Sequence, residues 1–169
     1  MDICTSLNKI KTFKKSILTI GVFDGLHLGH MKIIEKTSKL ALSKNLPSVL
    51  ITFHPHPKKI LTKNNNLNLL IEQDDKLKIL ANNCIDYVLI IPFSLQFSNI
   101  LPENFLNNYI IKYFNPKEII IGYDHRFGYK QKGDLKFLEE KSTIYNFTVH
   151  SINAYKRNDK VVSSTKIRK

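Results

Sequence analysis

From Gly21 to His30 the chain reads Gly-Val-Phe-Asp-Gly-Leu-His-Leu-Gly-His, and within this segment a strand pattern gives way to a helix pattern. The residues before it, Ser16 to Val22, form an apolar run typical of a buried strand. From Leu28 to about Ser43, apolar residues recur at helical spacing while lysines occupy the other face. The segment therefore predicts a strand–turn–helix corner, where unpaired backbone N–H groups at the helix start can bind a phosphate.

The residue types in this corner favour contact with a phosphorylated ligand. Gly21, Gly25 and Gly29 allow the backbone to approach a ligand closely or to adopt positive φ. His27 and His30 are three positions apart, so on a helical turn they project from one face. Two imidazoles there can donate hydrogen bonds to triphosphate oxygens and stabilise the charge that develops at an attacked phosphorus. His27 and His30 are therefore the candidate catalytic residues.

Two other interpretations of these histidines stay open. They can cap or pack the corner without touching a ligand, or they can bind a metal ion together with His54 or His56. The helical His-Glu-x-x-His pattern of zinc enzymes is absent, so no metal-ligating residue is predicted. Two competing phosphate motifs, Gly-x-x-x-x-Gly-Lys-Ser/Thr and Gly-x-Gly-x-x-Gly after the first strand, are absent as well.

Strand and helix patterns alternate along the rest of the chain. Further strands are predicted at Val49 to Phe53, Tyr87 to Ile91, Glu118 to Gly122 and Phe147 to Ile152. Helices are predicted at Asp74 to Asn83, with Leu77, Leu80 and Cys84 as its inner stripe, at Pro102 to Phe114, and before the last strand. Polar loops are predicted at Lys63 to Asn68 and at Asp124 to Asp134.

This alternation predicts an α/β fold, a Rossmann-like parallel sheet with flanking helices, in a single domain of residues 1–169. In such sheets ligands bind beyond the carboxyl ends of the strands. The unusual residues of this chain gather at those ends, at Phe23 to His30, His54 to Pro57 and Tyr123 to Gly128. We therefore expect one ligand site at that edge of the sheet.

The composition agrees with a compact domain inside the cell. Hydrophobic residues make up 43% of the 169 positions, and Cys4 and Cys84 are the only cysteines, which argues against a disulfide framework or a thiolate zinc site. The longest apolar runs fall far short of the roughly 20 residues that span a bilayer. No secretion signal is recognisable at the amino terminus. We therefore expect a cytoplasmic protein with no membrane partner.

The net charge of +12 has several interpretations. It is compatible with a nucleic acid, an anionic lipid or a phosphorylated ligand. It is equally compatible with a compositional bias, since the lysines are scattered and accompany abundant Ile and Asn. Aromatic residues do not interleave with a basic stripe as a single-strand-binding surface requires, so no nucleic-acid partner is predicted.

A second polar motif, Ser163-Ser164-Thr165-Lys166-Ile167-Arg168, lies near the carboxyl end of the sequence. Its hydroxyls can cap a helix and also contact a phosphate. Arg168, one turn beyond Ser164, can offer a bidentate fork to phosphate oxygens. Taken alone the motif is also compatible with a polar tail, but together with the histidine segment it indicates a triphosphate site.

Together the two motifs resemble those of the HIGH-type nucleotidyltransferase superfamily. Thr52-Phe53-His54-Pro55-His56-Pro57 and Gly122-Tyr123-Asp124-His125-Arg126-Phe127-Gly128, followed by Gly133-Asp134, resemble more narrowly the adenylyltransferase module of bacterial FAD synthetase. The resemblance runs from about Ser16 to Arg168. It implies the HIGH-type nucleotidyltransferase fold and transfer of the adenylyl group of ATP to FMN, giving FAD and pyrophosphate with Mg²⁺ bound to ATP.

The resemblance also implies roles for individual residues. His27 and His30 would hold the ATP phosphates near the reacting phosphorus. The nucleotide and its phosphates would be bound by Gly21, Phe23, Asp24, Gly25, Ser163, Ser164, Thr165 and Arg168. The loops around the flavin and nucleotide would contain Phe53, Pro55, His56, Pro57, Asp124, Arg126, Phe127 and Gly128.

Other interpretations stay open at this stage. Pro55 and Pro57 can simply end a strand, and Asp124 with Arg126 can be an ordinary loop ion pair. A different phosphorylated acceptor, or an inactive domain that only binds nucleotide, fits the same motifs. Nothing in the sequence corresponds to the riboflavin kinase module of the bifunctional family enzyme, so we expect no riboflavin kinase activity. The oligomeric state is not readable from the sequence.

Overall fold

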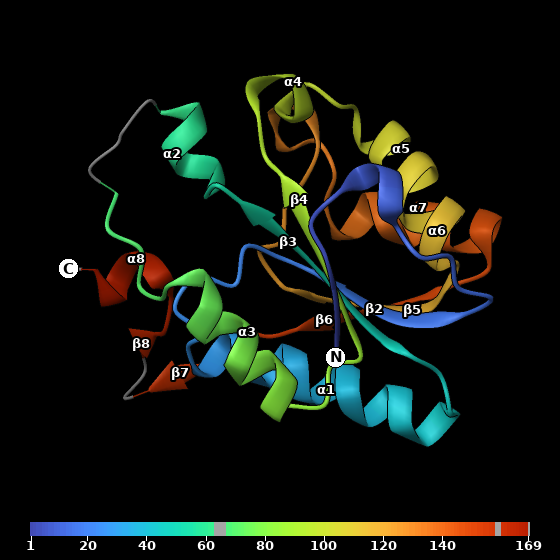
Figure 1. The fold of residues 1–169 in the computed structure, drawn as a ribbon, viewed down its shortest axis with the longest axis horizontal. Coiled ribbons are helices and arrows are strands. Elements are labelled where there is room, and N and C mark those ends of the chain that lie inside the picture. Colours follow the sequence, from blue (N-terminus) through green and yellow to red (C-terminus); the bar gives the residue numbers. More distant parts are fainter. Residues whose placement is uncertain (63–66, 158–159, 169) are drawn as a thin grey trace.

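The computed structural model describes residues 1–62, 67–157 and 160–168, and its centre is a six-stranded parallel sheet (Figure 1). The order of strands across the sheet is β1-β4-β3-β2-β5-β6. Their bounds are β1 (Asp2–Cys4), β2 (Ser16–Ile20), β3 (Ser48–His54), β4 (Tyr87–Pro92), β5 (Pro116–Gly122) and β6 (Thr148–Ile152). This is the Rossmann-like α/β fold that the sequence predicts.

Helices cover both faces of the sheet (Figure 1). One face carries α1 (Leu28–Lys44) and α3 (Gln73–Asn82). The other carries η1 (Leu7–Lys9), α5 (Pro102–Phe105), η2 (Leu106–Ile111), α6 (Lys112–Phe114) and α7 (Leu135–Tyr145). The remaining elements are short: α2 (Pro57–Leu61), α4 (Leu95–Ser98), η3 (Tyr129–Gln131), the hairpin of β7 (Lys156–Arg157) with β8 (Lys160–Val161), and α8 (Ser164–Ile167).

The sheet separates two hydrophobic clusters. Successive side chains of a strand point to opposite faces. Leu50 and Ile120 accordingly pack with α1 and α3 in one cluster, called here the α1 cluster. Their neighbours Ile51 and Ile119 pack with α5 to α7 in the other, called the α5 cluster. Because both faces are covered, the inner strands are continuous apolar runs instead of alternating patterns.

The predicted strands and helices are all present, and their ends agree within a few residues. Between Pro102 and Phe114 the structure has one helical stretch, but its middle part is a π-helix. Most of the predicted Lys63 to Asn68 loop lies outside the described residues.

Two details of the sequence analysis were incomplete or wrong. The edge strand β1 was not predicted, and neither was the β7–β8 hairpin. Cys84 was expected on the inner stripe of α3, but it lies beyond the helix end at φ 57° and is exposed. Leu80 of the same stripe is fully buried, as expected, and Leu77 packs against the α1 cluster.

The strand order determines where a ligand can bind. From β2 the chain passes outward to β3 and β4, then returns to the other side of β2 as β5 and continues to β6. The connections beyond β2 and β5 therefore leave in opposite directions and open a crevice at the carboxyl ends of these strands. The Gly21 to His30 segment follows β2, and Tyr123 and Asp124 follow β5.

Candidate functional site

A cavity of about 280 Å³ opens at this crevice. The first motif contributes Asp24, His27 and His30 to its lining, and the loop after β5 contributes Asp124. The carboxyl-terminal motif contributes Ser163, Ser164, Thr165 and Arg168, and the segment beyond β3 contributes His56 and Lys58. Segments that are far apart in the sequence thus form one pocket.

The turn after β2 has an unusual backbone. Phe23, Gly25 and Leu26 all have positive φ, at 51°, 80° and 39°. A Cβ at Gly25 would lie 2.9 Å from the side chain of Leu70, so glycine is required there by both conformation and space. Phe23 is 2% exposed, and its ring anchors the turn in the α1 cluster. This conformation directs the following residues into the pocket.

His27 and His30 stand side by side at the start of α1. The ring of His27 caps the helix, since its Nδ1 accepts a hydrogen bond from the His30 N–H at 3.4 Å. The two imidazoles are stacked, with ring centroids 3.6 Å apart and planes 19° from parallel. A Cβ at Gly29 would lie 3.2 Å from the His27 ring, so glycine leaves room for it.

Both imidazoles are held in the neutral form. The pKa of His30 is lowered to about 3, mainly by burial and to a smaller extent by the nearby His27 and Lys76. Burial also lowers the pKa of His27, while the Asp124 carboxylate opposes that shift. Among the described residues, Nδ1 of His30 is buried without a hydrogen-bond partner. A neutral imidazole can donate one hydrogen bond, so the pair is suited to contact an anionic ligand.

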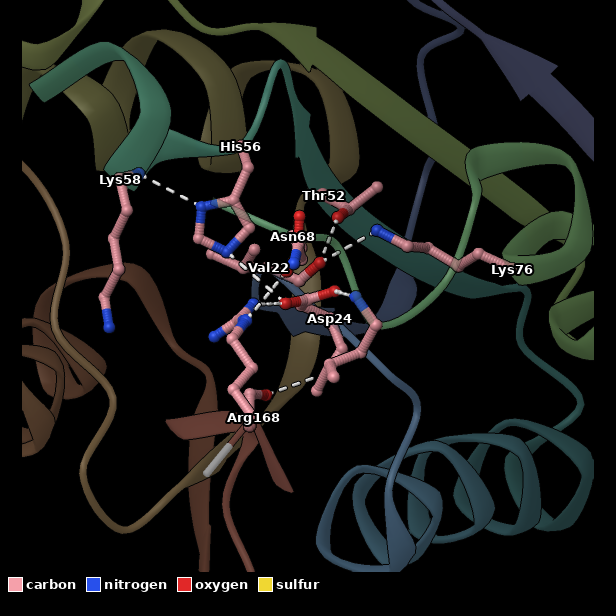
Figure 2. Close-up of polar contacts among 10 residues, drawn as sticks. Val22, Asp24, Thr52, His56, Lys58, Asn68, Lys76 and Arg168 are labelled. Carbon is pink, nitrogen blue, oxygen red and sulfur yellow. Dashed lines mark hydrogen bonds and ion pairs between the residues drawn. The ribbon is translucent and has the colours of Figure 1, made fainter. Parts of the chain in front are cut away.

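Asp24 joins the two motifs (Figure 2). Its carboxylate forms an ion pair with Arg168 and accepts a hydrogen bond from the Leu70 N–H at 3.0 Å. Its backbone carbonyl accepts a hydrogen bond from the Ser164 hydroxyl at 2.8 Å. Arg168 also donates through Nε to the Asn68 carbonyl at 2.9 Å. Asp24 therefore fastens the carboxyl-terminal motif and the segment before α3 to the turn after β2.

His56 approaches the same carboxylate oxygen of Asp24 that pairs with Arg168 (Figure 2). Its Nε2 is 3.8 Å from the Asp24 carboxylate, and its Nδ1 accepts a hydrogen bond from the Lys58 N–H, capping α2. The pKa of His56 is lowered to about 4, mainly by burial and to a smaller extent by Lys58, Lys76 and Lys59. His56 is therefore neutral at pH 7 and forms no ion pair with Asp24.

Lys76 is a residue of the site that the sequence analysis missed. Its Nζ donates to the Val22 carbonyl at 3.0 Å, and the Thr52 hydroxyl donates to the same oxygen at 3.0 Å (Figure 2). Burial lowers the pKa of Lys76 to about 8. No sequence signal distinguishes this lysine from the exposed lysines of the other helices.

Several candidate residues lie outside the pocket lining. Gly21 and Gly25 flank the lining residues 22–24 in the sequence. Pro57 begins α2, and Phe53 packs against Phe93 and Phe97. Pro55 follows the end of β3 and is also absent from the lining.

Of the candidate residues in the loop after β5, Asp124 lines the pocket, next to Tyr123. Arg126 pairs with Asp134, so the alternative of an ion pair between Arg126 and Asp124 is wrong. Phe127 is buried in the α5 cluster, and Gly128 lies against Pro102. Arg126, Phe127 and Gly128 are thus placed to shape the loop and not to line the cavity.

No group of three or more His, Cys, Asp or Glu side chains is close enough to hold a metal ion in residues 1–62, 67–157 and 160–168. Within the same residues, no helix has the length and apolar character needed to cross a membrane.

Comparisons with known proteins agree on one family. The family model described as FAD synthetase matches residues 9–166. A bifunctional riboflavin kinase/FMN adenylyltransferase of Buchnera aphidicola subsp. Schizaphis graminum is 39% identical over 165 residues, covering 97% of this chain and 52% of the relative. The Escherichia coli K12 protein of the same description is 30% identical over 152 residues, covering 90% of this chain and 49% of the relative.

A crystal structure of a Streptococcus pneumoniae protein, described as a macrolide-efflux protein, superposes with a TM-score of 0.84 at 26% identity. The match covers 99% of this chain and 55% of that one. The chain therefore spans about half the length of the proteins it matches.

Proposed function

The chain belongs to the FAD synthetase family, and from this premise we propose that it transfers the adenylyl group of ATP to FMN, forming FAD and releasing pyrophosphate. The observation that carries the proposal is the convergence of two phosphate-binding motifs on one pocket. The stacked imidazoles of His27 and His30 face the same cavity as the hydroxyls of Ser163 to Thr165. That cavity lies at the crevice between β2 and β5, where sheets of this type bind nucleotides.

The reaction is an in-line displacement at the α-phosphorus of ATP. An FMN phosphate oxygen forms the new bond to this phosphorus, and the bond to the bridging oxygen of pyrophosphate breaks. The acceptor phosphate already carries a negative oxygen, so no protein nucleophile is needed. Catalysis therefore consists of positioning the two substrates and stabilising the added charge.

His27 and His30 would stabilise that charge. Both are neutral in the free protein, so each can donate a hydrogen bond without the cost of burying a second cation. A bound triphosphate raises the pKa of a neighbouring imidazole and strengthens the hydrogen bond that it donates. We expect these contacts to be stronger in the transition state than with ATP in its ground state.

The carboxyl-terminal motif would bind the β- and γ-phosphates. Ser163 caps α8, and Thr165 is exposed beside the cavity, so the hydroxyls of this motif surround a helix start. Arg168 uses Nη2 for Asp24 and Nε for Asn68, which leaves Nη1 as its nitrogen without a described partner. We infer that Arg168 contacts phosphate through Nη1 while it remains attached to Asp24.

Mg²⁺ would enter the site with ATP. Of the pocket carboxylates, Asp24 is engaged with Arg168 and Leu70, whereas Asp124 is exposed at the rim. Asp124 fits an outer contact to a hydrated ion held mainly by the phosphates, which is the usual arrangement for Mg²⁺. When bound, Mg²⁺ neutralises charge on the phosphate oxygens.

The part of the pocket that binds the acceptor would be formed by the segments that follow β3 and β5. His56 lines the cavity beyond β3, and Asp124 lines it beyond β5. We propose ATP and FMN as the partners of this single adenylyltransferase domain. The cytoplasmic location and the absence of a nucleic-acid partner stay predictions from the composition.

The test is to incubate the purified protein with MgATP and either FMN or riboflavin, and to separate the flavins by chromatography. We expect FAD from FMN and no FMN from riboflavin. A panel of other phosphorylated acceptors distinguishes a different transferase of the superfamily. If folded protein, checked by circular dichroism, forms no FAD from FMN, the proposed activity is wrong.

A further inference from the structure

Lys76 lies in the first turn of α3 and extends to the base of the site. Figure 2 shows its side chain pointing towards the end of β2, where Nζ donates to the Val22 carbonyl at 3.0 Å. Lys78, two positions along the same helix, is exposed and pairs with Asp75 at 2.9 Å. The two lysines thus lie on the same helix, but Lys76 points into the protein and Lys78 is exposed to solvent.

The charge of Lys76 has no acidic partner in the described part of the chain. A buried ammonium that is paired only with a carbonyl is costly, which agrees with the lowered pKa of about 8. At pH 7 the side chain still carries its proton. The protein therefore keeps a positive charge beneath a pocket that we expect to hold a triphosphate.

Two histidines, His30 and His56, lie near this charge. His27 and Lys76 are neighbours of His30, and together with burial they lower its pKa. His56 faces Lys58, Lys59, Lys76 and the Asp24 carboxylate. Of the lysines in the described part of the chain, Lys76 alone contributes to lowering the pKa of both imidazoles.

Lys76 also holds the backbone of the first motif. The Val22 carbonyl accepts from Lys76 on one side and from the Thr52 hydroxyl on the other, immediately before the turn with positive φ at Phe23. Lys76 and Val22 line a small hollow together with Asp24 and His56, adjoining the main cavity, whose own lining does not include Lys76.

We propose that Lys76 is a positioning residue for the reaction, which holds the Val22 carbonyl in place and sets an unpaired positive charge beside His30 and His56. The part of the proposal that concerns the reaction rests on the proposed function. The part that concerns the histidines does not, because it applies to the protein without substrate.

The test compares Lys76→Gln, Lys76→Arg and the matched control Lys78→Gln. Glutamine at position 76 can still donate to the Val22 carbonyl but lacks the charge, and arginine keeps the charge. NMR titration of the imidazoles measures the pKa of His30 and His56 in the free protein. Steady-state kinetics of FAD formation measures kcat and the KM for ATP.

We expect Lys76→Gln to raise both histidine pKa values by about one unit, since a nearby buried charge acts on this scale. We also expect kcat to fall by about tenfold with a smaller change in the KM for ATP. Lys76→Arg and Lys78→Gln should keep the wild-type titration. If Lys76→Gln leaves both titrations unchanged, the proposal is wrong, whether or not the wild-type protein forms FAD. If Lys76→Gln does not fold, NMR titration of the Lys76 ammonium in the wild type decides instead: a pKa near 8 supports an unpaired charge held inside the site, and an ordinary pKa near 10.5 overturns the proposal.

Discussion

The Asp24 carboxylate forms an ion pair with the Arg168 guanidinium although 144 positions separate them in the sequence. Only 5% of the Asp24 side chain and 16% of the Arg168 side chain are exposed. The pair is therefore poorly screened by water, unlike the surface pair of Lys39 with Glu35. It brings the carboxyl-terminal hydroxyls to the histidines, so the proposed phosphate site forms only when both motifs are docked.

A double-mutant cycle with Asp24→Asn and Arg168→Gln tests this docking. Each single change leaves the other charge without its partner and should weaken ATP binding, with a coupling energy of about 1–3 kcal/mol. Titration calorimetry with ATP measures the four dissociation constants. The same cycle on the exposed pair of Glu35 and Lys39 is the control and should leave the dissociation constant for ATP unchanged. Additive losses at Asp24 and Arg168 would show that the pair does not assemble the site.

Replacing His30 with Gln tests its role in the transition state. We expect kcat for FAD formation to fall by about 100-fold, while the affinity for ATP changes much less. Stopped-flow single-turnover kinetics separates the chemical step from product release. His150→Gln is the control, because its imidazole pairs with Glu118 outside the pocket. A His30→Gln variant with normal turnover would refute the assigned role.

The lowered histidine pKa values predict a loss of stability in acid. His30 and His56 titrate near 3 and 4 in the folded protein and near 6.5 when unfolded, so the unfolded chain binds protons first as pH falls. Their stabilising contribution is complete above pH 6.5 and is lost below it. For His30 this loss amounts to about 1.4 kcal/mol per pH unit, or about 2 kcal/mol between pH 6.5 and pH 5.

Urea unfolding of the wild type and of His30→Gln at pH 7, 6 and 5 measures this effect. The free energy of unfolding of the variant should depend less steeply on pH than that of the wild type. His54→Gln is the control, since His54 is exposed and shows no such burial. Parallel pH profiles for the wild type and His30→Gln would contradict the assignment.

Gly25→Ala tests the backbone of the turn after β2. Alanine there must adopt φ 80°, and its Cβ would lie 2.9 Å from Leu70. We expect the free energy of unfolding to fall by about 2 kcal/mol. Gly122→Ala serves for comparison, because its Cβ would meet the Asp124 carboxylate at an ordinary 3.4 Å. Thermal unfolding followed by circular dichroism distinguishes the two, and equal midpoints would count against a required glycine.

The central parallel strands and the phosphate corner could be predicted because their signals are local. Each inner strand is an apolar run, and the corner between Gly21 and His30 contains its glycines and histidines in one short segment. The edge strand β1 has no such run. Its residues Asp2 and Ile3 are exposed, and β1 exists because it pairs with β4, which is a contact distant in sequence.

The contacts of single charged side chains could not be predicted, because they depend on how the elements pack. Lys76 looks like a solvent-facing helix residue, yet it is half-buried, with its ammonium donating to the Val22 carbonyl just beyond β2. Arg126 is closer in sequence to Asp124 than to Asp134, yet the loop returns at Gly133 and brings Asp134 beside it. Sequence proximity therefore favoured the wrong partner.

The separation of the two hydrophobic clusters by the sheet has a consequence for how this domain can change over evolution. In the part of the chain that the structure describes, no residue of the α5 cluster lines the main pocket, whereas Phe23 and Ile33 of the α1 cluster do. Substitutions that are distant and share no partner act almost independently. Substitutions in the α5 cluster can therefore change thermal stability without changing the pocket. Substitutions on the α1 side of the sheet can change which acceptor the proposed site binds.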